Sequence, residues 1–302
     1  MSHVVAVTGA SGFIGRHIVT ALVADGFAVR ALTRRLQPPL PGVRWVPGTL
    51  EDTLSLTRLV RGATAVIHCA GSVRGHSRAV FQASNVSGTL RLVRAAKAAG
   101  CKRFLLFSSL AARHPELSWY AESKWQAERS AIAAAGDMAL SVFRPTAVYG
   151  PGDKELRPLF KALLGGWLPR LGHADAQLSF LHVQDLARAT LCWLDAPLVT
   201  GRCYELSDGA SPAYGWPHLA AIGAAARGAP VRVIGIAPPL LQWFSRLNLA
   251  WHRVVGREPM LTPCKVNELR HSDWSSSNDA ASQDLRWSPS IKLEQALRER
   301  LF

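Results

Sequence analysis

The hydrophobic positions of the chain follow two alternating patterns through its first two-thirds. Short, almost wholly apolar runs predict buried strands, and the alanine-rich segments between them predict helices. The expected strands are 3–10, 28–34, 43–48, 64–71, 103–109 and 139–145, and the expected helices are 12–26, 52–62, 86–100 and 120–136. Strands that alternate with helices in this way indicate an α/β fold built on a doubly wound parallel sheet that is covered on both faces.

The pattern changes after about Pro151, where prolines, glycines and tryptophans become more frequent. We therefore expect a sheet domain over residues 1–150 and, over 151–302, mainly a smaller C-terminal region that binds the substrate. Residues 182–206 carry one more helix and one more strand, and we expect them to return to the first domain.

The composition is that of a folded globular chain. Its 302 residues are 48% hydrophobic and 19% charged, which argues against a disordered or fibrous protein. No apolar run is long enough for a spanning helix, and the first residues lack the charged and apolar regions of a signal peptide. The five cysteines are scattered, without a C-x-x-C pair or zinc-site spacing, so we expect a cytoplasmic protein without a metal.

The formal net charge of +14 raises the question of an anionic partner. The excess is mostly arginine spread along the chain, without a basic tract or a nucleic-acid-binding motif, so we expect no nucleic acid partner. An anionic cofactor is the simpler explanation. Residues 238–257 mix apolar and basic positions, which fits a substrate lid, a dimer helix, a peripheral membrane contact or a buried cap helix.

A glycine-rich turn follows the first expected strand. The segment VTGASGFIG places Gly9, Gly12 and Gly15 after that strand and at the opening of a helix. Such a turn lets the backbone approach a pyrophosphate closely, while the free amides of the helix N-terminus offer hydrogen bonds and partial positive charge. The spacing differs from the commonest dinucleotide fingerprint, but its place between a strand and a helix predicts nucleotide binding and a Rossmann-type sheet.

The end of the second expected strand indicates which dinucleotide is preferred. In such folds an acidic residue near this point holds the ribose 2′-hydroxyl, whereas arginine accommodates a 2′-phosphate. Arg34 and Arg35 stand here, with no acidic residue nearby. Two guanidiniums suit a dianionic phosphate through charge-assisted hydrogen bonds. The sequence therefore predicts NADP(H) in preference to NAD(H).

Tyr120 and Lys124 lie four positions apart in an expected helix, so their side chains share one face. An unperturbed tyrosine titrates near pH ~10, and a neighbouring ammonium is expected to lower that pKa and make the phenol an acid–base group. Ser108 and Ser109 end the preceding strand, where a hydroxyl can hold a substrate oxygen as charge develops on it. These residues predict hydride transfer in which a cofactor carries the hydride and the tyrosine handles the proton.

These motifs resemble the short-chain dehydrogenase/reductase family, in its extended epimerase/dehydratase-like branch. The resemblance extends over nearly the whole chain and is carried by TGASGFIG, HCAG at 68–71, NVSGTLRLVRAA, FRPTAVYGPGD, FLHVQDLARA and LRWSPSIKLEQAL. It implies NAD(P)-linked redox chemistry, with the substrate held by the C-terminal region.

The resemblance also implies roles for individual residues. Tyr120 is expected to be the acid–base group and Lys124 the cofactor clamp. Ser109 is expected to hold the substrate oxygen, with Ser108 as the fallback, and Asn85 to support a proton relay. The implied cofactor contacts are Gly9, Ser11, Gly12, Phe13, Ile14, Gly15, Arg34, Arg35, Leu50, Ala70, Gly71, Ser108, Tyr120, Lys124 and Pro145.

Several positions depart from the family pattern. Leu110 stands where the family usually has its substrate-polarising serine or threonine, and Thr49 where an aspartate that contacts adenine is common. The segment RPTA replaces the R-Y-F-N typical of epimerases and so loses an asparagine that contacts the sugar nucleotide. These departures favour the branch that resembles 3β-hydroxysteroid dehydrogenases and dihydroflavonol-type reductases.

We therefore expect an NADP(H)-dependent oxidoreductase, a monomer or homodimer, that interconverts a secondary alcohol and a carbonyl on a small molecule, with apolar substrates among the candidates. One alternative is an NAD-dependent sugar-nucleotide epimerase. A second is a non-catalytic NADP(H)-binding sensor or assembly factor, which Leu110 supports. The presence of Tyr120, Lys124 and Asn85 argues against that second alternative.

Overall fold

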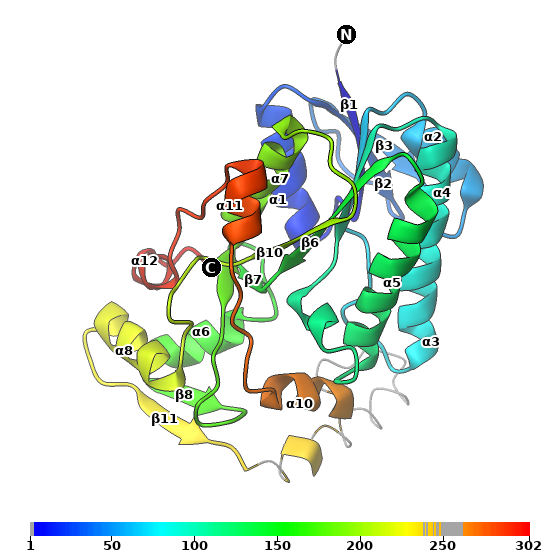
Figure 1. The fold of residues 1–302 in the computed structure, drawn as a ribbon. Coiled ribbons are helices and arrows are strands. Elements are labelled where there is room, and N and C mark those ends of the chain that lie inside the picture. Colours follow the sequence, from blue (N-terminus) through cyan, green and yellow to red (C-terminus); the bar gives the residue numbers. More distant parts are fainter. Residues whose placement is uncertain (1–2, 238, 240, 244, 246–247, 249–261) are drawn as a thin grey trace.

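The protein is described by a computed structural model over residues 3–237, 239, 241–243, 245, 248 and 262–302. The main sheet is built from β1 (Val4–Thr8), β2 (Ala28–Thr33), β3 (Val43–Pro47), β4 (Ala65–His68), β5 (Arg103–Phe107), β6 (Ala139–Pro145) and β10 (Arg202–Leu206). Among the described residues these seven strands are parallel, in the order β10-β6-β5-β4-β1-β2-β3 (Figure 1). After β1 the chain forms β2 and β3 on one side of that strand and then crosses to form β4 on its other side. Ligands of such sheets bind at the carboxyl ends of the strands where the strand order reverses in this way.

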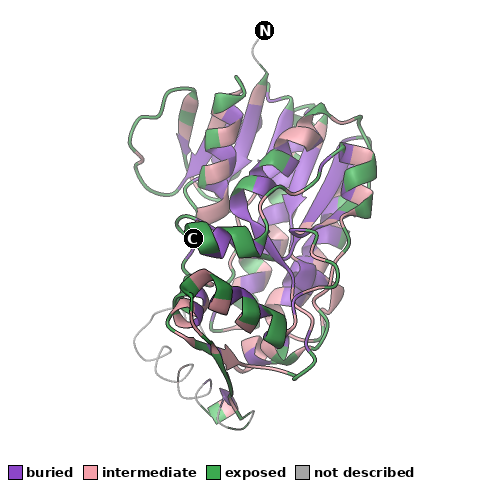
Figure 2. Ribbon diagram, turned by 90° about the vertical axis from the view of Figure 1, so that its left-hand side faces the viewer, coloured by how far each residue is buried: buried purple, intermediate pink, exposed green. Residues whose placement is uncertain are grey.

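Strand residues alternate between two buried layers because successive side chains point to opposite faces of a sheet. Val5 and Val7 of β1 belong to one cluster, and Ala6 between them belongs to the other. The first cluster includes residues of α1 (Phe13–Ala24), α7 (Val183–Asp195) and α11 (Asp279–Leu285), and the second those of α2 (Thr53–Val60), α4 (Gly88–Ala98) and α5 (Trp119–Ala135). Figure 2 shows the strands buried between these helices, which confirms the predicted doubly wound sheet.

A third buried cluster lies beyond the carboxyl edge of the sheet, in the lower part of Figure 1. Its aromatic core consists of Tyr149, Phe160, Phe180, Tyr214 and Trp216. The elements around it are β7 (Ala147–Tyr149), α6 (Arg157–Leu164), β8 (Trp167–Arg170), β9 (Phe180–His182), α8 (Trp216–Arg227), β11 (Arg232–Gly235) and α12 (Leu293–Glu299). β7 pairs with β9 and β8 with β11, each pair in parallel.

Four short helices lie at the carboxyl edge and shape the site. α3 (Arg78–Phe81) runs into the π-helix η1 (Gln82–Ser87), which continues into α4, and the 3₁₀-helix η2 (Leu110–Arg113) follows β5. α10 (Pro263–Arg270) lies near the N-terminal end of α5, because Asn267 donates to the backbone oxygen of Leu117 at 3.2 Å. In the described part of the chain, no helix has the length and apolar character needed to cross a membrane.

Candidate active site

The glycine turn after β1 is closed by contacts that exclude side chains. Gly9 has a φ of +71°, and a Cβ there would stand 2.6 Å from the amide nitrogen of Ala70 at the end of β4. A Cβ on Gly15 would stand 2.1 Å from the carbonyl oxygen of Gly9. The turn itself is held by Gly12, which donates to that same oxygen at 2.9 Å. Glycine is therefore required at 9 and 15 because the backbone segments touch.

The N-terminus of α1 fits a pyrophosphate. Gly12 is the N-cap residue, so no side chain satisfies the first amides of the helix, and its first turn holds no acidic residue. Ser11 and Gly12 are exposed, and Phe13 and Ile14 are half-buried. Unsatisfied amides at a helix N-terminus attract an anion through both hydrogen bonds and the helix dipole. The residues present thus suit the phosphates of a dinucleotide.

Arg34 and Arg35 follow β2, the neighbour of β1 in the sheet, and both are exposed. The hydroxyl of Thr33 donates to the backbone oxygen of Arg35 at 2.6 Å and fixes the turn that presents them. Leu50, after β3, packs against Gly88 of α4, where a Cβ would stand 2.9 Å from Leu50 Cδ1. These predicted cofactor contacts lie after adjacent strands and therefore at one edge of the sheet.

A chain of hydrogen bonds ties β1 and β4 to the helix that carries Asn85. His68 Nδ1 bonds to the Thr8 hydroxyl at 2.6 Å, and Nε2 to the Thr89 hydroxyl at 2.9 Å. Thr89 in turn donates to the backbone oxygen of Asn85 at 2.5 Å. Burial lowers the pKa of His68 to about 3, so the imidazole is neutral at physiological pH. These hydrogen bonds link β1, β4 and α4, and the sequence analysis did not predict them.

Asn85 holds the loop after β4 against α5. It lies in the π-helix η1, a distortion that is frequent at functional sites. Its Nδ2 donates to the Ser72 backbone oxygen at 3.0 Å and to the Ser123 hydroxyl at 2.9 Å, while its Oδ1 accepts from the Ser72 amide at 2.7 Å. A Cβ on Gly71 would stand 2.9 Å from Asn85 Oδ1. Asn85 therefore positions the backbone on which the predicted contacts Ala70 and Gly71 lie.

Tyr120 and Lys124 share one face of α5, as their spacing predicts. Ser118 caps the helix by accepting from the Ala121 amide at 3.0 Å, which places Tyr120 in the first turn. Lys124 Nζ donates to the backbone oxygen of Phe107 at 2.9 Å and lies 6.0 Å from the centroid of the Tyr120 ring. Burial lowers the pKa of Lys124 to about 8, although Cys69 and Glu128 favour its charge.

The two serines after β5 face different partners. The Ser109 side chain forms a hydrogen bond with Tyr120 and also accepts from the Ala111 amide at 3.2 Å. The Ser108 hydroxyl instead donates to the buried carboxylate of Glu128. Glu128 also accepts from Arg144 at 2.6 and 3.0 Å, so Ser108 belongs to a buried charged network. The geometry brings Ser109, the first candidate, to the tyrosine.

The pKa of Tyr120 departs from the expectation. Burial raises it above the ordinary value, and this outweighs the Ser109 hydrogen bond and the charge of Lys265, which lower it. Glu268 adds a further rise. The expected lowering of this pKa by Lys124 is therefore wrong, because desolvation of the phenolate dominates. At neutral pH Tyr120 is a phenol that can give up a proton.

Pro145 is buried at the end of β6, and the residue after it has an unsatisfied group. The Thr146 hydroxyl oxygen is buried and has no hydrogen-bond partner among the described residues. Because β6 lies next to β5 in the sheet, this hydroxyl follows the strand beside the one that Ser108 and Ser109 follow. No pattern in the sequence indicates this unpaired hydroxyl.

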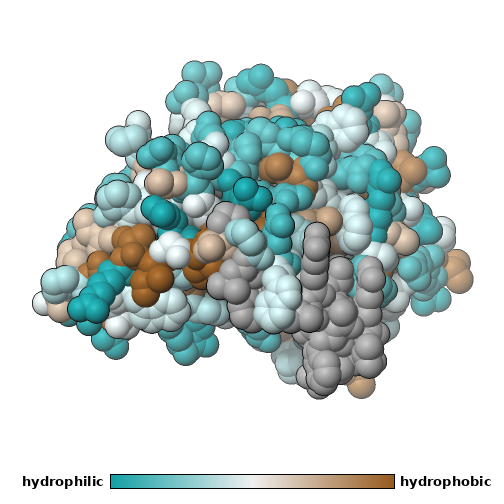
Figure 3. Space-filling view, turned by 90° about the horizontal axis from the view of Figure 1, so that it is seen from below, coloured by the Kyte–Doolittle hydropathy of each residue, from teal (hydrophilic) through white to brown (hydrophobic). Residues whose placement is uncertain are grey.

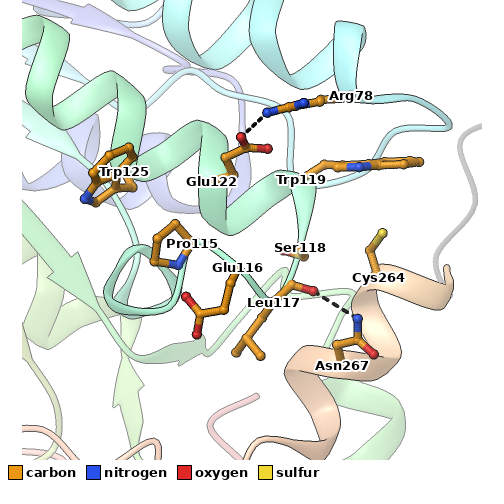
Figure 4. Close-up of a pocket in the computed structure, with 10 residues that line it drawn as sticks. All are labelled: Arg78, Pro115, Glu116, Leu117, Ser118, Trp119, Glu122, Trp125, Cys264 and Asn267. Carbon is orange, nitrogen blue, oxygen red and sulfur yellow. Dashed lines mark hydrogen bonds and ion pairs between the residues drawn. The ribbon is translucent and has the colours of Figure 1, made fainter.

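Two neighbouring pockets open beside the first turn of α5. A small pocket of about 20 Å³ is lined by Tyr120, and its walls include Val73, Phe81, Lys265 and Glu268. A wider hollow of about 510 Å³, shown in Figure 4, is lined by Arg78, Pro115, Glu116, Leu117, Ser118, Trp119, Glu122, Trp125, Cys264 and Asn267. Ser118, Trp119 and Cys264 form walls of both pockets. The wider hollow therefore adjoins the tyrosine pocket.

Lys265 and Glu268 of α10 were not among the predicted site residues. They lie far from Tyr120 in the sequence, and no motif marks them. The segment 238–257, for which four structural roles were open, lies largely outside the described residues.

Comparisons with known proteins show the family of the chain. The sequence model described as "NAD dependent epimerase/dehydratase family" matches residues 5–206. A ceramide reductase from Caulobacter vibrioides (strain NA1000 / CB15N) is 38% identical over 281 residues, covering 91% of this chain and 86% of that protein. A 3 beta-hydroxysteroid dehydrogenase/Delta 5→4-isomerase from Mycobacterium tuberculosis (strain CDC 1551 / Oshkosh) is 30% identical over 340 residues, covering 98% and 89%.

A solved structure has the same architecture. MoeE5 in complex with UDP-glucuronic acid and NAD matches with a TM-score of 0.75 and 23% sequence identity, over 98% of this chain and 96% of that one. At this identity the likeness shows the fold.

Proposed function

Because the chain belongs to the NAD-dependent epimerase/dehydratase family and is an NAD(P)-dependent enzyme of the extended short-chain dehydrogenase/reductase kind, we propose that it is an NADP(H)-dependent reductase of a carbonyl on an apolar, lipid-like substrate. The observation that carries the proposal is the surroundings of Tyr120, where Ser109 contacts the phenol and the Nζ atoms of Lys124 and Lys265 lie 6.0 and 5.8 Å from the ring centroid. The pKa of Tyr120 lies above its ordinary value, and Ser109 forms a hydrogen bond with the Tyr120 side chain. A protonated phenol is the form that reduction of a carbonyl requires, because the alcohol oxygen needs a proton.

The residues divide the work of reduction as follows. Bound NADPH would supply the hydride that reaches the carbonyl carbon. Tyr120 donates its phenolic proton to the carbonyl oxygen, and Ser109 donates a hydrogen bond to that oxygen as negative charge builds up on it. Lys124 favours the resulting phenolate electrostatically, and solvent then returns a proton to Tyr120.

Other residues of this chain would bind the cofactor or position the backbone of the site. Gly9, Gly12 and Gly15 would admit the pyrophosphate, and Arg34 with Arg35 would hold a 2′-phosphate. Both amide hydrogens of Asn85 are used in bonds to Ser72 and Ser123. We therefore assign Asn85 a positioning role that supports the relay, with no proton passing through its side chain.

The substrate class rests on the relatives and on the surface. The ceramide reductase and the 3 beta-hydroxysteroid dehydrogenase act, by their names, on lipids. The region beyond the carboxyl edge exposes large apolar side chains: Trp167 is 47% exposed, Ile234 50% and Val233 41%. Figure 3 shows apolar side chains at the left of the lower face, over the region of β8 and β11. An exposed patch of this kind suits contact with an apolar phase.

The same face suits the surface of an anionic membrane, the phase in which a lipid substrate would be found. Trp167 stands beside Arg232 in the β8–β11 ladder, and Arg170 ends β8. Among the described residues neither arginine pairs with a carboxylate. By the register of this ladder, Trp167, Arg232 and Ile234 point to one face, and we call these three residues the basal patch. Tryptophan with arginine is a combination that binds the interface of anionic bilayers.

Oxidation of NADPH by long-chain ketones tests the proposal, with the wild type compared with Tyr120→Phe. We expect the wild type to reduce the ketone, and Tyr120→Phe to lose turnover by at least about a hundredfold while NADP⁺ affinity stays within a few-fold. Turnover that survives in Tyr120→Phe contradicts the assigned acid. A UDP-sugar that raises the melting temperature, together with no ketone reduction, would favour the epimerase instead.

A further inference from the structure

Tyr120 is approached by a second ammonium, from a different part of the chain. Lys265 Nζ, on α10, lies 5.8 Å from the centroid of the Tyr120 ring, close to the 6.0 Å of Lys124 Nζ. Lys124 is turned to the cofactor edge of the sheet, where a Cβ on Gly71 would stand 3.2 Å from its Nζ. Lys265 instead lines the small pocket in front of Tyr120, together with Val73.

A buried carboxylate fixes the position of Lys265. Glu268 accepts from Lys265 Nζ at 2.6 Å through one oxygen and from the Ser118 hydroxyl through the other. Ser118 also caps α5, so one residue connects α10 to the helix that carries Tyr120. Burial opposes the charge of Lys265, but Glu268 keeps its pKa above the ordinary value, so the group is an ammonium at neutral pH.

Lys265 keeps hydrogen-bond capacity for a ligand. An ammonium has three donors, and Glu268 is the acceptor that the described residues offer it. Its side chain is 44% exposed, whereas that of Glu268 is 7% exposed. Lys265 also lines the pocket beside Tyr120, so we expect its remaining donors to be available to a molecule bound next to the tyrosine.

The charges around the two pockets determine which kind of acceptor on a ligand Lys265 would favour. Lys265 is paired with Glu268, Arg74 with Glu155, and Arg78 with Glu122. Each of these cations is thus already compensated by a carboxylate. A carboxylate on the ligand would meet Glu268 as well as Lys265, whereas an uncharged oxygen gains a charge-assisted hydrogen bond without that repulsion.

We propose that Lys265 forms a second recognition point for the substrate and donates to an uncharged acceptor oxygen, such as an amide carbonyl, carried close to the carbonyl that is reduced. This inference rests on the proposed reductase function and specifies its substrate class. Lys265 is then a residue that discriminates between carbonyl compounds, whereas Lys124 serves the cofactor and the tyrosine.

Three probes of equal chain length test the inference: an N-alkyl-3-oxoalkanamide, the ketone that lacks the amide, and the 3-oxoalkanoate. We expect the wild type to prefer the amide. In Lys265→Met the ratio of kcat/KM for the amide to that for the ketone should fall about tenfold or more, mainly through KM, because a hydrogen bond to a charged group is lost. Lys265→Arg, which keeps N–H donors, should recover part of the ratio.

Lys161→Met, a change of an exposed lysine on α6, is the matched control and should leave the ratio unchanged. Glu268→Gln removes the compensating charge in a nearly isosteric way and should move preference toward the 3-oxoalkanoate; melting curves check that it folds. A ratio in Lys265→Met equal to that of the wild type overturns the subsite. A wild type that reduces none of the three probes overturns the reductase proposal itself.

Discussion

Gly15 lies directly against Gly9, since a Cβ on Gly15 would stand 2.1 Å from the carbonyl oxygen of Gly9. Gly15→Ala must therefore push the start of α1 away from β1. We expect a loss of roughly 1–3 kcal/mol of unfolding free energy, the usual cost of overpacking, together with loss of NADP⁺ binding. Thermal melting and calorimetric titration measure the two effects.

Gly12→Ala is the matched comparison within the same turn. Its φ of −77° is open to any residue, and the nearest contact of a new Cβ is at 3.1 Å. Because this contact is tight but much longer than the 2.1 Å of Gly15, we expect a smaller loss of stability than in Gly15→Ala. Because Gly12 is exposed at the anion site, we expect NADP⁺ binding weakened about tenfold. Equal binding by Gly12→Ala and the wild type would show that no phosphate lies over this turn.

Arg34→Ala should weaken NADP⁺ binding about tenfold or more and leave NAD⁺ binding unchanged, because only NADP⁺ carries the 2′-phosphate. Arg35→Ala tests the second guanidinium in the same way. Arg94→Ala, at an exposed arginine on α4, controls for the loss of positive charge. Calorimetric titration with each dinucleotide gives both affinities. A wild type that binds NAD⁺ more tightly than NADP⁺ would refute the assignment of Arg34.

Ser109→Ala should mainly lower activity, whereas Ser108→Ala should mainly lower stability. Ser109 is bonded to Tyr120, so we expect its removal to lower kcat by about a hundredfold with little change in melting. Ser108 is bonded to the buried Glu128, so its removal should cost roughly 1–3 kcal/mol of unfolding free energy. Steady-state kinetics and denaturant unfolding of both variants check this. The reverse pattern would make Ser108 the residue that holds the substrate oxygen.

The serines also show where prediction from the sequence stops. The parallel sheet, the glycine turn and the pairing of Tyr120 with Lys124 follow from local spacing, because helix and strand periods fix which neighbours share a face. The choice between Ser108 and Ser109 depends on where Glu128 and Tyr120 of α5 come to lie against β5. Such packing is not encoded in a local period.

Contacts between segments that are distant in the sequence could not be predicted from local patterns either. Lys265 and Glu268 reach Tyr120 only because α10 packs beside the first turn of α5. The raised pKa of Tyr120 has the same origin, since burial is a property of the whole fold and overrides the expected influence of a nearby lysine.

The lowered pKa of Lys124 predicts a pH-dependent stability. Below about pH 8 the residue is charged in the folded and unfolded states, and folding leaves that charge poorly hydrated. Between about 8 and the ordinary 10.5, only the unfolded state binds the proton, so the contribution of Lys124 to the unfolding free energy rises with pH. The slope is at most about 1.4 kcal/mol per pH unit.

The comparison of wild type with Lys124→Met isolates this slope. The buried thiol of Cys101, whose pKa burial raises to about 11, changes stability in the opposite direction but equally in both proteins. Denaturant unfolding at several pH values should show the wild type gaining relative to Lys124→Met as pH rises above 8. A constant difference would mean that Lys124 keeps its ordinary pKa in the fold.

The basal patch should bind anionic vesicles. Trp167 and Arg232 stand side by side across the β8–β11 ladder, so one surface offers both an apolar anchor and a positive charge. We expect the wild type to sediment with phosphatidylglycerol vesicles at low salt and to be released as salt screens the attraction. Trp167→Ser with Ile234→Ser should reduce binding at every salt concentration, whereas Arg232→Gln should mainly reduce its salt dependence.

Two results would count against this membrane contact. Equal binding to neutral and anionic vesicles would remove the role of the arginines. In the second result, the wild type stays in solution with both kinds of vesicle and is a dimer, whereas the Trp167→Ser, Ile234→Ser protein is a monomer. This result would show that the patch is covered by a second copy of the chain. Arg94→Gln, an exposed arginine on α4, controls for net charge, because its loss leaves the basal patch intact and should leave vesicle binding nearly unchanged.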